Sequence, residues 1–299
     1  NTWVAERNGS MTQDGRNPAW DSLPATRRED LAHRMAVYAA MVERMDHNIG
    51  RLTASLRDRG ELENTLVVFL SDNGACAEWD PFGFDLDPRA YDNNRPGHGI
   101  NSHTPNMPNT LHTGNMLATM GGPDSMFSVG CAWANLSNTP LNYYKHYTHE
   151  GGIRTPMIAH WPAGIRDPGR ITPHVAHVMD VMATFIEVGG ASYPQASETS
   201  SVLPLEGKSF APAFSGEANT QRALLFEHER NIALRDGDWK LVAHNAVRKE
   251  GLAQDARWEL YNLKEDPVEQ KDLAAKYPKR TERLVQLIEQ EARRTLVLP

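Results

Sequence analysis

The sequence of 299 residues contains only two cysteines, Cys76 and Cys131. They are too few for a disulfide framework and match no metal-binding spacing, which leaves one bridge or two buried thiols as the alternatives. No apolar run approaches the roughly 20 residues that a membrane-spanning helix needs. Positive charge is not in excess either, because the formal net charge is −7. The sequence therefore gives no reason to expect a membrane span, a nucleic acid or an anionic membrane as partner.

What is present is the composition of an ordinary globular protein, with 40% hydrophobic and 23% charged residues. A chain of this length can bury a sizeable core, in one large domain or two unequal ones. It begins Asn1-Thr2-Trp3, with neither an initiator methionine nor a signal peptide. We therefore expect a piece of a longer protein.

Residues 65–70 form an apolar, β-branched run without alternation, which is typical of a strand covered on both faces in a parallel sheet. The run ends in Ser71-Asp72-Asn73-Gly74, and ligands collect beyond the carboxyl ends of such strands. A carboxylate beside an amide offers two oxygen ligands to a divalent cation. Gly74 would let the chain turn away sharply.

A long helix is predicted before this strand. Thr26 and Glu29 fit a capping box at its start, and the helix is expected to end at Gly60. Apolar residues at alternating steps of four and three draw one stripe: Leu31, Met35, Tyr38, Val42, Met45, Ile49, Leu52 and Leu56. The stripe fits a coiled-coil seam or a helix packed on a sheet, and the nearby strand favours the sheet.

Residues 80–115 are rich in Pro, Gly, Asn and Asp and are predicted to form a long loop. Its three histidines are His98, His103 and His112. Their spacing matches no metal motif, so solvated loop histidines are favoured over a metal site, and a substrate contact by one of them stays open.

Further along, residues 157–161 are predicted to form a short buried strand. Thr172 and Pro173 are the expected start of a helix that ends at Gly189-Gly190. Strand and helix alternate in this order, which favours an α/β class with a mostly parallel sheet flanked by helices. We expect this α/β domain to cover residues 1–206.

The remaining residues, 207–299, are predicted to form a small α+β domain after a Ser/Pro/Gly-rich linker. A hairpin turn is expected at Asp236-Gly237. The predicted elements are strands at 223–229, 232–235, 239–244 and 258–263 and a helix at about 277–294.

Three segments together resemble a known family. They are Ser71–Gly74, then Lys145 with Glu150-Gly151-Gly152-Ile153-Arg154-Thr155-Pro156, and the hairpin Arg235–Leu241 followed by Leu260–Pro267. In this order they resemble the C-terminal part of a type I sulfatase, of the arylsulfatase family in the alkaline-phosphatase-like superfamily. The resemblance runs from about Leu31 to the end of the chain.

The resemblance implies a calcium- and formylglycine-dependent sulfuric ester hydrolase. Asp72 and Asn73 would bind the calcium, and Asp72 would also help to activate the formylglycine hydrate that attacks sulfur. Lys145 would contact the sulfate, whose negative charge a preorganised cation can stabilise. His146 and His149 would line the substrate pocket. The implied substrate is a small-molecule or glycan sulfate ester, and the implied compartment is periplasmic or secreted.

The sequence departs from the family at the nucleophile. Neither cysteine begins a Cys/Ser-x-Pro-x-Arg motif, and Ser22-Leu23-Pro24-Ala25-Thr26 has threonine where arginine is required. The paired aspartates that complete the calcium site are also not visible. We therefore expect this chain to be inactive alone, to hold calcium weakly if at all, and to be able to self-associate through exposed sheet edge and apolar surface.

Two alternatives stay open. A phosphodiester or phosphonate hydrolase of the same superfamily would share the layout, although such relatives often carry histidine at the position of Asn73. A non-catalytic, glycan-binding or scaffold relative is the second alternative.

Overall fold

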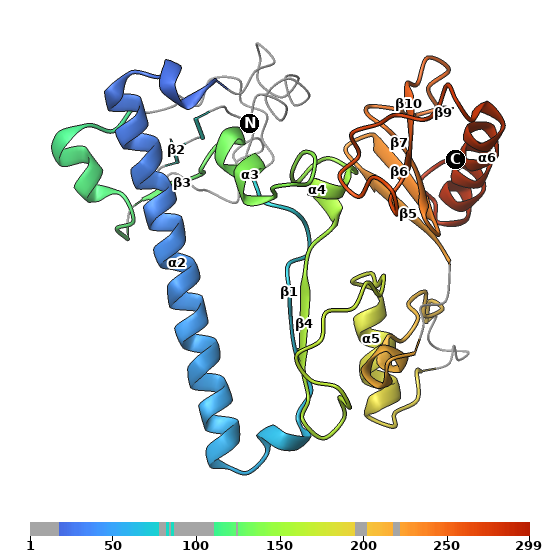
Figure 1. The fold of residues 1–299 in the computed structure, drawn as a ribbon, viewed down its shortest axis with the longest axis horizontal. Helices are drawn as coiled ribbons and strands as arrows, with labels where there is room; N and C mark the ends of the chain where they lie inside the picture. Colours follow the sequence, from blue (N-terminus) through green and yellow to red (C-terminus); the bar gives the residue numbers. More distant parts are fainter. Residues whose placement is uncertain are drawn as a thin grey trace. The chain divides into compact units, whose positions relative to one another are not determined.

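The computed structural model describes residues 18–77, 82–83, 85–86, 111–123, 125–194, 202–217 and 222–299 (Figure 1). Two compact units divide the chain. The first contains Asn1–His47, Asn73–Thr155 and Ala223–Pro299, and the second contains Asn48–Asp72 and Pro156–Arg222. These units interleave along the chain, so they do not test the domain boundary expected at 206/207, which stays a prediction.

The predicted long helix is α2, Ala25–Asp58. Gly60, at φ 69°, follows its end in the left-handed conformation that favours glycine, as expected. The capping box is wrong, because the helix begins before Thr26 and this residue lies within the first turn. The segment before α2 contains a short 3-10 helix, η1 (Trp20–Ser22).

The apolar stripe of α2 is largely exposed. Leu31 is buried near the helix start, where its carbonyl accepts a hydrogen bond from the Trp133 indole at 3.0 Å. Further along, exposed fractions of 41–57% are found for the stripe residues Tyr38, Val42, Met45 and Leu52. The prediction that this stripe packs on a sheet is therefore wrong for the described residues.

The predicted central strand forms as β1 (Val67–Leu70) and pairs with β4 (Met157–His160). The pair is antiparallel, as are all the strand pairs among the described residues. No residue of β1 or β4 is buried, and Ile158 is 61% exposed. The expected parallel pairing and two-sided cover of β1 are therefore wrong here, because a strand with one partner has an open edge and open faces.

The helix expected from Thr172 begins later, as α5 (Asp180–Val188). Its start is held by the Asp180 carboxylate, which accepts hydrogen bonds from the backbone N–H groups of His177 and Lys208, both at 2.8 Å. The residues between Thr172 and α5 are irregular, so the proposed cap is wrong. The expected end at Gly189-Gly190 is confirmed.

The C-terminal sheet has four antiparallel strands in the order β10-β7-β6-β5 (Figure 1). They are β5 (Ala223–His228), β6 (Asn231–Asp236), β7 (Trp239–Ala243) and β10 (Trp258–Asn262). Helix α6 (Pro278–Arg294) packs on this sheet, and side chains from both form one core. Its most buried members include Ile232, Leu234, Leu241, Leu260, Leu284 and Ile288. The predicted strands and helix are confirmed, with the hairpin turn one residue later, at Gly237-Asp238.

The remaining elements are short. The strands are β2 (Asp85–Leu86), β3 (Met126–Phe127), β8 (Val247–Arg248) and β9 (Gly251–Leu252). The helices are η2 (Leu62–Asn64), η4 (Gly114–Thr119), α3 (Cys131–Ser137), α4 (Glu150–Ile153) and η5 (Ala211–Ser215). No disulfide joins Cys76 and Cys131. Within the described part of the chain, no helix is both long and apolar enough to cross a membrane.

Candidate functional site

The corner predicted to bind a cation follows β1 directly. Asp72 to Gly74 form a bend, in which Asp72 is exposed and Asn73 is half-buried. The two side chains belong to different compact units, because the division falls between them. The sequence therefore located the corner correctly, and its role as a metal site stays a prediction.

Gly74 is required at this corner by a close approach of two backbones. A Cβ atom on residue 74 would lie 1.7 Å from the carbonyl oxygen of Gly151. The Gly74 N–H also donates to the carbonyl of Gly152 at 2.9 Å. These contacts join the corner to the Glu-Gly-Gly run and explain why residue 74 has no side chain.

Lys145 lies beside the same segment. Its backbone N–H donates to the Ala75 carbonyl at 3.0 Å, and its Nζ lies 3.8 Å from the sulfur of Cys76. These partners follow Asn73 by two and three residues. The structure therefore brings Lys145 beside the residues that follow Asn73, and its contact with sulfate stays a prediction.

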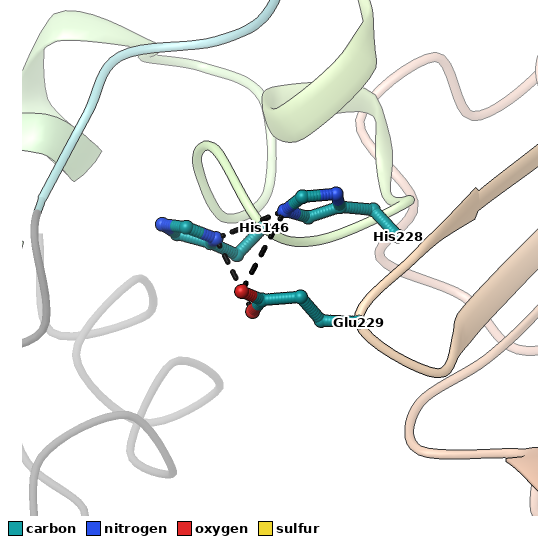
Figure 2. A group of neighbouring side chains, drawn as sticks. All are labelled: His146, His228 and Glu229. Carbon is teal, nitrogen blue, oxygen red and sulfur yellow. Dashed lines mark hydrogen bonds and ion pairs between the residues drawn. The ribbon is translucent and has the colours of Figure 1, made fainter. Parts of the chain in front are cut away.

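His146 lies in a group with two residues that the sequence did not single out. Figure 2 shows its imidazole facing the side chains of His228, at the end of β5, and Glu229, in the following turn. Nδ1 of His146 lies 3.1 Å from Nε2 of His228 and 3.3 Å from a Glu229 oxygen. The predicted contact of His146 with substrate is not tested by this arrangement.

His149 points into an aromatic cluster. Its ring lies 4.5 Å from that of Tyr143 and 6.2 Å from that of Tyr147, measured between centroids. Its Nε2 lies 3.3 Å from a carboxylate oxygen of Glu259 on β10, and the residue is buried. These contacts hold the residue that precedes α4, and a role of His149 in substrate binding stays a prediction.

A fully buried ion-pair group connects α4 to the C-terminal sheet. Nζ of Lys240 on β7 lies 2.9 Å from Glu150 and 2.8 Å from Glu269. The other oxygen of Glu269 accepts the backbone N–H of Glu150 at 2.7 Å. The start of the Glu-Gly-Gly run is thereby held on the sheet by two charged side chains.

The charges of this group shift one another's pKa. Burial alone would raise the pKa of Glu150, but the ammonium of Lys240 and the guanidinium groups of Arg235 and Arg154 together outweigh burial and hold that pKa below its usual range. Burial alone would lower the pKa of Lys240, but Glu150 and Glu269 outweigh it and raise that pKa. Glu150 and Lys240 are therefore both charged across the neutral range.

The loop histidines expected to be solvated divide into two cases. His98 and His103 lie outside the described residues. His112 is only 13% exposed in its side chain, and its Nδ1 lies 3.2 Å from Asp30, whose carboxylate also pairs with Arg34 at 3.3 Å. The expectation of a solvated histidine is therefore wrong for His112, because a buried carboxylate of α2 binds it.

The described residues do not make a complete calcium site at the corner. Calcium takes six to eight oxygen ligands, whereas the corner offers the carboxylate of Asp72 and the amide of Asn73. Among the described residues, one group of three or more His, Cys, Asp or Glu side chains is close enough to hold a metal ion, and Asp72 is not a member. The donor types at the corner fit calcium, but their number does not.

Sequence reasoning missed His228, Glu229, Lys240 and Glu269. The chain separates His228 from His146 by 82 positions, and no spacing rule connects them. Lys240 belongs to the hairpin motif from which the family resemblance was drawn, but its partners depend on how β7 meets α4. A lysine at a core-facing strand position is the one local signal, because such a residue needs buried acidic partners.

Comparison with known proteins gives two family matches. Residues 3–191 match the family described as Sulfatase, and residues 141–295 match N-sulphoglucosamine sulphohydrolase, C-terminal. An uncharacterised sulfatase of Schizosaccharomyces pombe is 32% identical over 87% of this chain and 43% of its own length. An arylsulfatase of Klebsiella aerogenes is 32% identical over 69% of this chain and 40% of its own length. The chain thus spans less than half the length of these relatives.

Solved structures share the fold. The crystal structure of Ps i-CgsB in complex with k-i-k-neocarrahexaose is 23% identical, covers 88% of this chain and 46% of its own, and has a TM-score of 0.56. The likeness confirms the predicted class, a partial α/β fold of the alkaline-phosphatase-like kind with a small C-terminal sheet and helix.

Proposed function

Because the chain belongs to the sulfatase family, we propose that the full protein hydrolyses a sulfuric ester and that this chain supplies part of the active site. The observation that carries the proposal is the attachment of Lys145 to Ala75 and Cys76. This attachment supports a role for the Lys145 ammonium near the residues that follow the corner. The order of the three sequence motifs supports the same reading.

Each site residue has a distinct role in this proposal. The ammonium of Lys145 stabilises negative charge on the sulfate during transfer. The interaction of a preorganised cation with the sulfate oxygens becomes stronger as negative charge develops on them. Asp72 and Asn73 supply two of the oxygen ligands of a calcium ion, and Asp72 also contacts the nucleophile. A formylglycine hydrate supplies the attacking oxygen when present, and no Cys/Ser-x-Pro-x-Arg segment in this sequence provides it.

The proposed substrate is a sulfate ester of a sugar or an aryl alcohol. Support for a glycan comes from the fold neighbour whose crystal structure contains k-i-k-neocarrahexaose. Support for an aryl sulfate comes from the arylsulfatase relative. A polymeric glycan substrate would also fit the proposed periplasmic or secreted location, because such polymers are met outside the cytoplasm.

The test uses the full-length protein and variants of Lys145. Lys145→Ala should lower kcat/KM for an aryl sulfate by about 10²–10³-fold, the usual cost of removing one charge-stabilising group. The matched control is Lys264→Ala, since Lys264 is exposed. Retained activity in Lys145→Ala, or an equal loss in Lys264→Ala, would contradict the assigned role.

Two further measurements separate the alternatives. The ratio of aryl sulfate to phosphodiester turnover should favour sulfate, and the opposite ratio would identify a phosphodiester hydrolase. Absence of any turnover in the full-length protein would favour a non-catalytic relative.

For this chain alone we propose no turnover and weak calcium binding. Calorimetric titration with calcium should show no tight site, because the corner offers two oxygen ligands of the six to eight required. Tight binding, or turnover of an aryl sulfate by the purified chain, would show that the chain holds a complete site.

A further inference from the structure

The group formed by His146, His228 and Glu229 has the spacing of a metal centre. His146 Nδ1 lies 3.1 Å from His228 Nε2 and 3.3 Å from one Glu229 oxygen, and His228 Nε2 lies 3.9 Å from the other Glu229 oxygen. Ligand atoms at about 2.0–2.2 Å from a tetrahedral zinc ion are roughly 3.3–3.6 Å from one another. One ligand atom from each residue lies within 4.8 Å of the other two, so side-chain movements would bring both imidazoles and one carboxylate oxygen into contact with a single ion.

The donor types select the class of cation. Two imidazole nitrogens and one carboxylate oxygen suit zinc and related transition metals. Calcium prefers a shell made of oxygen atoms, so these donors would serve it poorly. The group therefore differs in chemistry from the Asp72-Asn73 corner.

The scaffold holds the ligands in place. His228 pairs with Asn231 across the β5–β6 hairpin, so Glu229 and Arg230 form a two-residue turn. Their φ values of 51° and 72° correspond to a turn that usually contains asparagine and glycine. Two larger side chains occupy this turn instead, and the Glu229 side chain is directed at the histidines (Figure 2).

The loop of His146 is attached to the same hairpin. The side-chain amide of Asn231 donates to the His146 carbonyl at 2.7 Å, and its oxygen accepts the Asn245 N–H at 2.9 Å. His146 itself has a φ of 85°, which is rare for a residue with a side chain. Hydrogen bonds of the Asn231 side chain, outside the group, thus hold the His146 loop on the hairpin, as a preorganised site requires.

Exposure of the group allows an ion to enter. The His146 side chain is 8% exposed, whereas the values for His228 and Glu229 are 52% and 38%. One ligand is therefore buried and two face solvent. Three protein ligands also leave a fourth position for water.

We propose that His146, His228 and Glu229 bind one divalent transition-metal cation of the zinc class. The ion connects the loop that carries Lys145 to the β5–β6 turn. This site rests on the geometry of the group and is independent of sulfatase activity. The competing reading is a pair of histidines that share a hydrogen-bonded proton with the carboxylate and bind no metal.

The test is zinc binding by the chain, purified without a histidine tag and stripped with a chelator. Equilibrium dialysis and calorimetry should give one tightly bound zinc per chain, and calcium should not displace it. Loss of a partner that merely supports a metal ligand typically costs 10- to 100-fold in affinity. His228→Ala and Glu229→Gln should therefore each weaken zinc binding by at least about tenfold.

Matched controls exclude general effects of surface histidines and acids. His47→Ala on α2 and Glu250→Gln change exposed residues outside the group and should leave zinc affinity unchanged. Circular dichroism verifies the fold of each variant, and Glu229→Gln keeps the side-chain shape if His228→Ala disturbs the hairpin. Bound cobalt(II) should show the intense visible absorption of a four-coordinate ion.

Three outcomes would overturn the proposal. They are the absence of saturable zinc binding, binding that is unchanged in His228→Ala and Glu229→Gln, and binding that falls equally in His47→Ala. The absence of zinc binding would support the alternative in which the two histidines share a hydrogen-bonded proton with the carboxylate. Either of the other two outcomes would mean that zinc binds at other residues. None of them depends on whether the protein hydrolyses sulfate esters.

Discussion

The C-terminal sheet and the β1–β4 strand pair are both antiparallel, but they differ in how they bury apolar side chains. In the C-terminal sheet, Ile232, Leu234 and Leu241 are fully buried beneath α6. In the strand pair, Phe69 is 42% and Ile158 is 61% exposed. One region completes a core with its own helix, and the other presents apolar residues to solvent.

The difference shows which region of this chain is self-sufficient. Apolar burial drives folding at about 25 cal/mol per Å² removed from water. The C-terminal sheet obtains this contribution within residues 223–299, whereas β1 and β4 have one partner each. The chain spans 43% and 40% of the length of its two reported relatives.

The largest expected effect comes from Lys240, where the C-terminal sheet holds the Glu-Gly-Gly run. Lys240→Met leaves the carboxylates of Glu150 and Glu269 buried without their cation. Breaking a buried pair on one side typically costs about 3–5 kcal/mol, so the urea midpoint of this unit should fall sharply. The exposed control Lys264→Met should change the free energy of unfolding by less than about 0.5 kcal/mol.

A triple variant separates charge from packing at this position. Lys240→Met combined with Glu150→Gln and Glu269→Gln removes all three charges and should recover part of the lost stability. A loss below about 1 kcal/mol in Lys240→Met alone would mean that the ion pairs do not stabilise the junction.

A second prediction compares the two regions with the same substitution. Ile288 on α6 is fully buried and Ile158 on β4 is 61% exposed. Ile288→Ala should cost about 2–5 kcal/mol through lost transfer energy and a cavity. Ile158→Ala should cost about 0.5 kcal/mol or less, because little surface is buried there. Equal losses in urea unfolding would contradict the contrast in burial between the two regions.

The smallest expected effect is on the pH dependence of folding stability, and it concerns His244, which follows β7. Burial lowers the pKa of His244, a neighbouring His149 charge lowers it further, and Glu259 partly offsets both. The unfolded chain, with a histidine pKa near 6.5, then binds more protons than the folded protein as pH falls below about 6.5. Stability therefore decreases from neutral to acidic pH.

His244→Gln removes that contribution, so its unfolding midpoint should fall less between pH 7 and pH 5 than the wild-type midpoint. The control is His160→Gln on β4, an exposed histidine of the other region. If both variants follow the wild-type pH profile, His244 does not couple to folding.

Local patterns in the sequence predicted those parts of the molecule in which neighbours along the chain determine structure. The strands predicted at 223–229, 232–235, 239–244 and 258–263 correspond to β5, β6, β7 and β10, and the helix predicted at about 277–294 corresponds to α6. The abrupt end of an apolar run identified the corner at Asp72-Asn73. Thr26 and Thr172 failed as helix caps because local cap patterns compete with tertiary contacts, such as the hydrogen bonds to the Asp180 carboxylate.

The sequence by itself determined the strands and the helix of the C-terminal domain. It also determined the position of the Asp72-Asn73 corner and the family that its motifs resemble. Only the tertiary structure decided that β1 pairs with β4, that Lys240 meets Glu150 and Glu269, and that His146 meets His228 and Glu229. The physical reason is range, because periodicity and turn chemistry act over a few residues. Contacts between residues 82 or more positions apart depend on the path of the whole chain.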